Sequence, residues 1–317
     1  MKFGVFYEHQ LPRPWTDTSE LDLLQESLDQ VELADQLGYD YCWEVEHHFL
    51  EEYSHSSAPE VFLGAVSQRT KRIRLGHGIM QLTTNQPHRV AEKVATLDLL
   101  SRGRVELGMG EGGGPAELHP FGVQVRSKRD RWIEAVKAII PMFSRTAWEF
   151  HGDFYDFPAR NVVPKPIPKP HPPLWVACTN VKTIAQAAEW GMGALGFSFV
   201  DATAAQAWVN KYYNTFRTRQ YEAAHVDQVI LLNQAGKTTH GDICDSLKLF
   251  ADEVMPEFRD RHSEHEAWKQ DVLGGRIMLD ALDTDSHDLY AYQTRDVMAN
   301  KLSAEQIRER MLAKAAK

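Results

Sequence analysis

The segment Tyr39-Asp40-Tyr41-Cys42-Trp43-Glu44-Val45-Glu46-His47-His48-Phe49 begins as a strand-like run and closes with two carboxylates and two histidines. These ionisable residues stand where an apolar strand passes into a loop. In barrels built from alternating strands and helices, the residues at the carboxyl ends of the strands face the reaction chamber. A strand that ends in this way therefore indicates chemistry rather than packing.

Short apolar runs that read as strands recur along the chain, and amphipathic helical patterns separate most of them. The predicted strands are residues 2–6, 39–45, 73–80, 105–109, 174–178, 194–199 and 228–233. Between the first two, Leu21, Leu24, Leu28, Val31 and Leu37 recur at helical spacing. Alternating strands and helices predict a parallel sheet, and strands that are apolar throughout predict cover on both faces. The expected fold is α/β, either a barrel or a doubly wound sheet.

Composition limits the kind of protein. The chain has 317 residues, 43% of them hydrophobic and 25% charged, and no run approaches the ~18 apolar residues that span a bilayer. Its start lacks the pattern of a secretory signal, so we expect a cytoplasmic protein without membrane contact. A net charge of -9 argues against nucleic acid as a partner. Three scattered cysteines, Cys42, Cys178 and Cys244, predict neither a disulfide framework nor a zinc ribbon.

Two segments interrupt the regular alternation. Residues 147–158 carry two aromatic-rich arms around a Gly-Asp turn and predict a small hairpin insertion. The proline-rich residues 164–173 cannot be helical and predict a rigid connector. We place a barrel domain at residues 1–260 and a charged, helical C-terminal extension at 261–317.

The histidine pair supplies the candidate catalytic group. Adjacent side chains of a strand point to opposite faces, so His47 and His48 cannot both reach one site while the strand persists. A metal site is the competing interpretation, because donors are dense here: Glu44, Glu46, His47, His48, Glu51, Glu52 and His55. The cluster lacks the H-E-x-x-H spacing of a helical zinc site, so we expect no metal.

Glycines mark the next two strands. Gly76 and Gly78 interrupt an apolar strand, which indicates a bulge or the close approach of a flat ligand, or alternatively tight strand packing. The run Gly108-Met109-Gly110-Glu111-Gly112-Gly113-Gly114-Pro115 is not the dinucleotide fingerprint, and we expect a mobile active-site loop.

Two later segments have the chemistry of a phosphate site. The basic residues Arg126, Lys128, Arg129 and Arg131 cluster at the predicted start of a helix, where cations are unfavourable unless an anion lies among them. The alternative is a solvated basic turn. Residues 178–183 combine hydroxyl and amide side chains before another helix, which suits either helix capping or phosphate binding.

These segments, in this order, resemble the bacterial luciferase-like flavin monooxygenase family. The resemblance rests on residues 1–4, 43–49, 86–92, 100–104, 120–122, 164–166 and the final strand and helix within 226–256. It covers about residues 1–260. It implies a TIM-type (β/α)8 barrel that holds FMN at the carboxyl ends of its strands.

The resemblance also assigns roles to residues. His47 matches the family's active-site histidine, and Gly78-Ile79 match a non-prolyl cis peptide beneath the flavin. Gly110 stands where luciferases carry a reactive cysteine, so light emission is not expected. Arg129 and residues 179–183 match positions that hold the FMN phosphate. We therefore expect a catalytic His47 and a cofactor site formed by Glu46, Gly78, Ile79, Met80, Gly110, Glu111, Arg129, Cys178, Thr179, Asn180, Lys182 and Thr183.

The chain departs from the family between its sixth and last predicted strands. Only one helical stretch, from 202 to about 224, lies there, and no seventh strand is visible. The chain looks internally shortened near residues 220–221. Either the barrel has seven strands, as in the shortened non-fluorescent flavoproteins, or part of the natural chain is missing from this sequence.

The resemblance implies an FMN-dependent monooxygenase that takes reduced FMN from a separate flavin reductase and uses O2 to oxidise a small, apolar organic substrate. The alternatives are a non-catalytic flavin-binding protein with a shortened barrel and a deazaflavin-dependent oxidoreductase. A homodimer is expected from the family.

Overall fold

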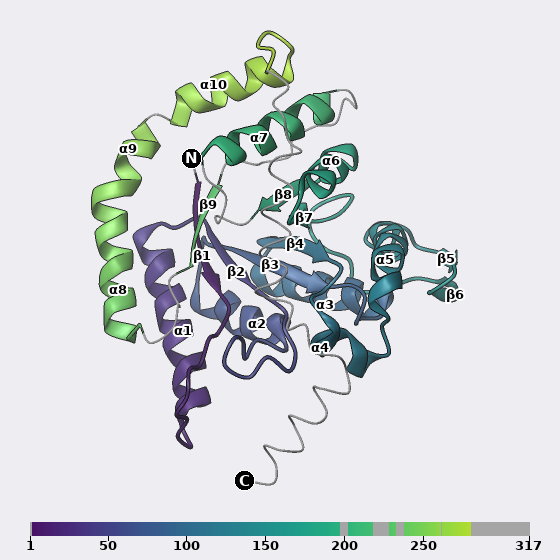
Figure 1. Cartoon of the computed structure of the whole chain (residues 1–317), viewed down its shortest axis with the longest axis horizontal. Helices are drawn as coiled ribbons and strands as arrows, with labels where there is room; N and C mark the ends of the chain where they lie inside the picture. The colour runs from purple at the N-terminus through teal and green to yellow at the C-terminus, as the bar shows by residue number, and fades with distance from the viewer. Residues whose placement is uncertain (1, 197–201, 218–227, 233–237, 261, 280–317) are drawn as a thin grey trace.

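One curved sheet of seven parallel strands organises the computed structural model, which describes residues 2–196, 202–217, 228–232, 238–260 and 262–279 (Figure 1). The strands are β1 (Lys2–Tyr7), β2 (Tyr41–Glu44), β3 (Arg74–Gln81), β4 (Val105–Gly110), β7 (Leu174–Cys178), β8 (Gly193–Gly196) and β9 (Gln228–Leu232). Their order in the sheet is β8-β7-β4-β3-β2-β1-β9. Within the described ranges β8 and β9 are the two end strands.

The expectation of a shortened TIM-type barrel is confirmed. The described residues between β8 and β9 form helix α7 (Ala202–Arg217) and contain no further strand. The predicted strand ends at Phe199 and Asn233, and the shortening near 220–221, lie outside the described residues. The described residues therefore contribute seven strands to the barrel.

Helices cover the outer face of the sheet (Figure 1). They are α1 (Ser19–Leu37), α2 (Pro59–Arg69), α3 (Pro87–Ser101), α5 (Lys128–Met142), α6 (Val181–Glu189), α7 and α8 (His240–Leu249). Proline occupies the first helical position of α2 and α3, where the missing N–H has no intrahelical partner to lose. Gly38 ends α1 in the left-handed conformation, with φ of 85°, as a C-terminal cap requires. None of the helices in the described ranges is long and apolar enough to cross a membrane.

The C-terminal helices run along one side of the sheet. The final helix expected within residues 226–256 is α8, which is followed by a π-helical segment (Phe250–Val254) and α9 (Met255–Asp260). Helix α10 (His262–Leu273) continues the path, and its Trp268 ring contacts Tyr213 of α7. The division of the chain at residue 260 stays a prediction.

Two tryptophans fill the inside of the barrel. Trp43 of β2 and Trp175 of β7 are buried and meet edge to face, with ring centroids 5.5 Å apart. A Cβ atom on Gly76 would lie 2.2 Å from the Trp43 ring, and one on Gly193 would lie 2.1 Å from the Trp175 ring. Of the alternatives for Gly76, the structure therefore supports tight packing rather than the approach of a ligand. Because side chains fill the interior, a ligand site must lie above them at the carboxyl ends of the strands.

Strand β3 is irregular where the second glycine stands. The pairing of β3 with β4 shifts register between His77 and Met80, which confirms the predicted bulge. The Gly78–Ile79 peptide bond within the shift is cis, as the resemblance implies. Gly78 and Ile79 are half-buried, whereas His77 and Met80 on either side are fully buried.

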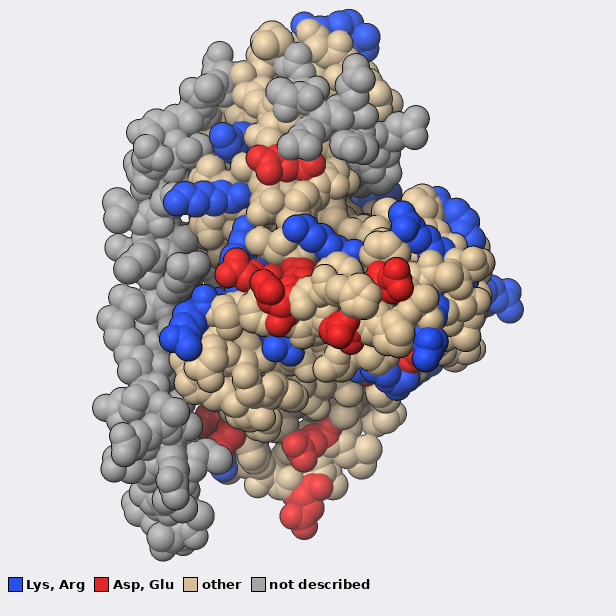
Figure 2. All heavy atoms as spheres, turned by 90° about the vertical axis from the view of Figure 1, so that its right-hand side faces the viewer, with Lys and Arg blue, Asp and Glu red and all other residues tan. Residues whose placement is uncertain are grey.

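The predicted hairpin is confirmed as β5 (Trp148–His151) and β6 (Asp156–Arg160), which lie beside α5 (Figure 1). Glu134 of α5 accepts backbone N–H groups from Asp153, Phe154 and Tyr155 at 2.7–3.0 Å, so the helix holds the turn. The face that carries this hairpin shows acidic and basic side chains interspersed rather than one large basic patch (Figure 2).

Substituting Gly76 by alanine should destabilise the protein. The new methyl group meets the buried indole of Trp43, so the free energy of unfolding should fall by about 1–3 kcal/mol. Gly64→Ala in α2 is the matched control, because nothing lies within 4 Å of its Cβ position and a helical alanine is favoured by about 0.5–1 kcal/mol. Denaturant unfolding of both variants measures the difference; equal stabilities would contradict the packing described.

Candidate active site

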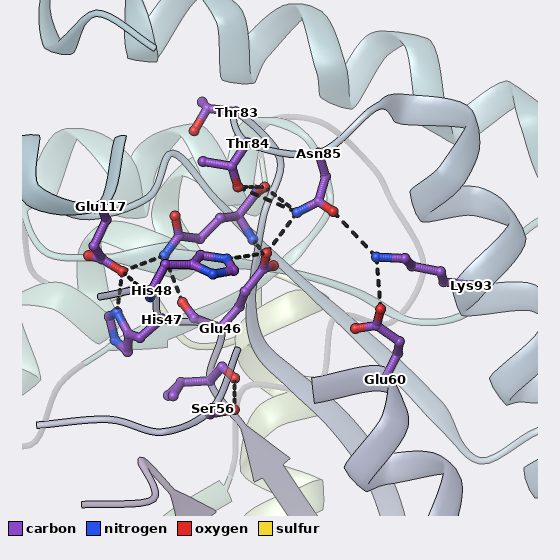
Figure 3. A network of polar contacts seen from close by, with 12 residues as sticks. Glu46, His47, His48, Ser56, Glu60, Thr83, Thr84, Asn85, Lys93 and Glu117 are labelled. Carbon is purple, nitrogen blue, oxygen red and sulfur yellow. Dashed lines mark hydrogen bonds and ion pairs between the residues drawn. The ribbon is translucent and has the colours of Figure 1, made fainter. Parts of the chain in front are cut away.

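The histidine pair lies outside the sheet. Strand β2 ends at Glu44, three residues before His47, so the alternation that separated the two side chains does not apply. The expectation that only one of them can reach the site held for a continuing strand, and here the chain has already left the strand. Phe49 takes a φ of 62°, and the turn it makes allows His47 and His48 to join one polar network (Figure 3).

Glu117 is the centre of that network. It lies on the short helix α4 (Pro115–Leu118) and is 3% exposed. Its Oε1 accepts hydrogen bonds from His47 Nδ1 at 2.8 Å, Gln81 Nε2 at 2.9 Å and the His48 backbone N–H at 3.1 Å. One carboxylate oxygen therefore joins the loops that follow β2, β3 and β4.

Glu46 forms a second anchor in the same loop. Its Oε2 accepts the Gln81 backbone N–H at 2.8 Å. Its Oε1 accepts from Asn85 Nδ2 at 2.8 Å and lies 3.1 Å from His48 Nε2 (Figure 3). Glu46 is buried, and these contacts tie the end of β2 to the loop before α3. Its predicted contact with a cofactor stays a prediction.

His47 is left with its other ring nitrogen toward β1. Nε2 lies 3.6 Å from Oε2 of Glu8, the residue that follows β1, and the His47 side chain is 23% exposed. Tyr53 donates its hydroxyl to Glu8 Oε1 at 3.2 Å and packs edge-on against the His47 ring. The imidazole is thus held between two carboxyl groups at the barrel mouth.

The surroundings change how readily these groups hold a proton. Burial alone would lower the pKa of His47, but the hydrogen bond to Glu117 and the charges of Glu117, Glu8 and Glu46 outweigh it and raise that pKa. Burial opposes ionisation of Glu117, yet the bonds from His47, Gln81 and His48 lower its pKa. His47 is therefore favoured as imidazolium and Glu117 as carboxylate.

A floor of small residues lies beside the network. The half-buried Gly78 and Ile79 of β3 adjoin Gly110 at the end of β4. A Cβ atom on Gly110 would stand 2.7 Å from Ile79 Cδ1 and 3.6 Å from Ala177 Cβ. The structure thus brings three of the predicted flavin contacts together, with Ile79 packed against the buried Gly110.

Two of the expected contacts point elsewhere. Met80 and Cys178 are fully buried in the core cluster between the sheet and the helices, so their side chains do not reach the mouth. His77 is also fully buried, and burial lowers its pKa to about 4, which keeps it neutral. A ligand at the mouth would meet only the backbone of Met80 and Cys178.

The residues expected at a phosphate meet on another side of the mouth. Arg129, near the start of α5, donates to Glu111 Oε1 at 2.9 Å and to Gln186 Oε1 of α6 at 3.0 Å. Asn180 caps α6 by accepting the Thr183 N–H at 3.0 Å, which confirms the capping interpretation of this segment. Thr179 and Lys182 are exposed beside the cap. Phosphate binding there stays a prediction.

The loop between Gly110 and α4 is held in place by a lysine. Lys128 Nζ donates to the carbonyl oxygens of Gly112 and Gly113, each at 3.2 Å. The predicted mobility of this loop stays a prediction. Among the described residues, no group of three or more His, Cys, Asp or Glu side chains is arranged to hold a metal ion.

Sequence reasoning missed Glu8, Gln81 and Glu117. Glu8 directly follows the first strand and Gln81 ends the third, so their place at a strand end was an available signal. The sequence signal for Glu117 was weak, because it is an acidic residue in the first turn of a helix too short to show a periodic pattern.

Comparison with known proteins identifies the family. The model of the luciferase-like monooxygenase family matches residues 1–314, and the chain belongs to this family. The alkanal monooxygenase beta chain of Vibrio harveyi is 27% identical over 237 residues, which cover 74% of this chain and 72% of that protein.

Other curated relatives are matched over a shorter stretch. The oxygenase component of the flavin-dependent trigonelline monooxygenase of Acinetobacter baylyi is 29% identical over 184 residues, 57% of this chain and 49% of that protein. The chain spans about half the length of this relative and of two uncharacterised proteins of Sinorhizobium fredii.

Solved structures share the fold. The monooxygenase RslO1 of Streptomyces bottropensis superposes with a TM-score of 0.75 at 22% identity, over 81% of this chain and all of that chain. An F420-dependent secondary alcohol dehydrogenase superposes with a TM-score of 0.61 at 21% identity, over 72% of this chain and 68% of that chain. At these identities the likeness shows the barrel alone.

Neutralising Glu117 should change stability in a pH-dependent way. The raised pKa of His47 stabilises the fold fully below the ordinary value of 6.5 and loses its effect as pH rises through the folded-state pKa. The lowered pKa of Glu117 stabilises above 4.5 and is lost as pH falls through its folded-state pKa. Glu117→Gln should therefore cost about 1–3 kcal/mol, with the largest loss between pH 4.5 and 6.5. Urea unfolding from pH 4 to 9 measures this; a loss that does not vary with pH would contradict the ion pair.

Proposed function

We propose that this chain is an FMN-dependent monooxygenase that binds reduced FMN from a separate reductase and uses O2 to oxidise a small, apolar organic substrate. The observation that carries the proposal is the position of His47, held at the mouth by Glu117 beside the Gly78–Ile79 floor. The family and its named relatives, which include flavin-dependent and alkanal monooxygenases, support the reaction class.

The residues at the mouth fit a flavin. Gly78, Ile79 and Gly110 form a low floor that suits a flat ring, and a larger side chain at 110 would collide with Ile79. Arg129 and the exposed Thr179 and Lys182 at the start of α6 supply the charge and donors that a phosphate needs. The flavin, when bound, would supply the electrons that activate O2.

The protein's own part is to hold and move a proton. Glu117 fixes Nδ1 of His47 as the donor, so Nε2 is the ring position that exchanges a proton at the mouth. A general acid or base in this place typically contributes ~10²–10⁴ in rate.

An aromatic rim supports an apolar substrate. Phe49 and Phe121 are 63% and 41% exposed, and the rings of both lie within 6.0 Å of the His48 ring. A homodimer also belongs to the proposal. The side chains of Val61 on α2 and Leu99 and Leu100 on α3 are exposed and would be covered by a second copy.

Replacing His47 should separate oxygen consumption from productive oxidation. The wild-type protein loaded with reduced FMN should slow the appearance of oxidised FMN after mixing with O2, compared with free reduced FMN. His47→Gln should speed the appearance of oxidised FMN and of peroxide by up to about 10²-fold, toward the rate of free reduced FMN, while the final yield of peroxide per flavin stays the same. His55→Gln is the control, because that histidine pairs with the exposed Glu20. Oxidation at the rate of free reduced FMN in both wild type and His47→Gln would favour a non-catalytic flavin-binding protein.

Affinity for two cofactors tests the flavin assignment. Arg129→Gln should weaken FMN binding by about ten- to a hundredfold, as expected for loss of a charged hydrogen bond to phosphate. Arg160→Gln is the control, since Arg160 is exposed at the end of β6 in the hairpin. Calorimetric titration with FMN and with F420 measures both affinities. Tighter binding of F420 would support the deazaflavin-dependent alternative, which structural neighbours with that cofactor keep open.

A further inference from the structure

Glu8 has no role in the function proposed above, yet it lies at the centre of the site. It directly follows β1 and is 4% exposed. Oε1 accepts the Tyr53 hydroxyl, whereas Oε2 has no hydrogen-bond partner among the described residues. That oxygen lies 3.6 Å from His47 Nε2.

A buried carboxyl oxygen without a donor is costly. Since Nδ1 of His47 already donates to Glu117, Nε2 is the only ring position left to meet Glu8. A single proton between Nε2 and Oε2 would satisfy both atoms. The separation of 3.6 Å closes to a hydrogen bond with a shift of well under 1 Å.

We propose that Glu8 is a positioning residue that shares one proton with Nε2 of His47, so that the ring and the carboxyl act as a single proton-holding pair. The pair has the same net charge whether the proton is on nitrogen or on oxygen. When Nε2 gives its proton to a ligand at the mouth, neutral imidazole and Glu8 carboxylate remain, and a proton from solvent restores the pair.

The other charged groups around the pair support sharing. His47 faces Glu117 on α4, Glu46 on its own loop, and Tyr53. Glu8 faces Tyr53, and the more distant Glu44 and Glu117. Burial raises the pKa of Glu8 against the opposing effects of His47 and Tyr53, while the pKa of His47 is also raised. Both groups therefore hold a proton more readily than they would in water.

The test is an NMR titration of the His47 ring in the full chain. In Glu8→Gln the titration midpoint of His47 should fall by about one pH unit, because a nearby carboxylate no longer stabilises the imidazolium. Glu20→Gln is the matched control; Glu20 pairs with His55 at 2.9 Å and should leave the His47 midpoint unchanged. An unchanged midpoint in a folded Glu8→Gln protein would overturn the proposal.

Two further measurements cover a variant that does not fold. Glu8→Asp keeps the charge one methylene further from the ring, so a smaller fall of the midpoint is expected. In the wild-type protein labelled at glutamate side-chain carbons, the Glu8 carboxyl and the His47 ring should report the same macroscopic midpoints. Independent midpoints would count against a shared proton.

The catalytic consequence rests on the proposed function, but the titration needs neither flavin nor substrate. A lowered midpoint in a protein that binds no FMN would support the pair and contradict the proposed function. If the protein binds FMN but the His47 midpoint is unchanged in Glu8→Gln, the shared proton is contradicted and the proposed function is supported. In an active enzyme, Glu8→Gln should also shift the His47 limb of the pH–rate profile while leaving the affinity for reduced FMN unchanged.

Discussion

The hydrogen bonds that converge on one oxygen of Glu117 determine the geometry of the mouth. Three donors from two different loops meet there, and the acceptor itself comes from a third. The carboxylate thus joins segments that lie far apart in the sequence. Because the site is buried, a donor left without this acceptor would carry a desolvation cost. The arrangement is therefore cooperative: the loops take up their positions together.

The barrel beneath provides a rigid base for this network. Trp43 and Trp175 fill the interior, and the glycines opposite them allow the rings to lie flat against the strands. A filled interior leaves the carboxyl ends of the strands as the one place where loops from β1 to β4 can meet a ligand. The same strands carry the apolar outer layer on which the helices pack. The two faces of the sheet thus serve packing, and the carboxyl ends of its strands carry the site.

The sequence predicted the strands well because each is a short apolar run between helical patterns, and such runs are local signals. It also predicted the cis Gly78–Ile79 bond through a family motif, whereas the roles of His47 and Arg129 stay predictions. It failed for Glu117, which contacts His47 across 70 residues of chain and lies on a single helical turn. Strand alternation could not place His48 either, since both histidines lie beyond the end of β2. Contacts between distant loops leave no periodic trace, so only the fold reveals them.

The close fit of Gly110 under Ile79 also constrains how this mouth could be redesigned. A side chain at 110 and the present rotamer of Ile79 compete for the same space. Introducing a thiol or any other reactive group at the end of β4 would require the Ile79 side chain to move, or a smaller residue to take its place. The residues at 79 and 110 are therefore coupled through packing, and a larger side chain at one position calls for a compensating change at the other.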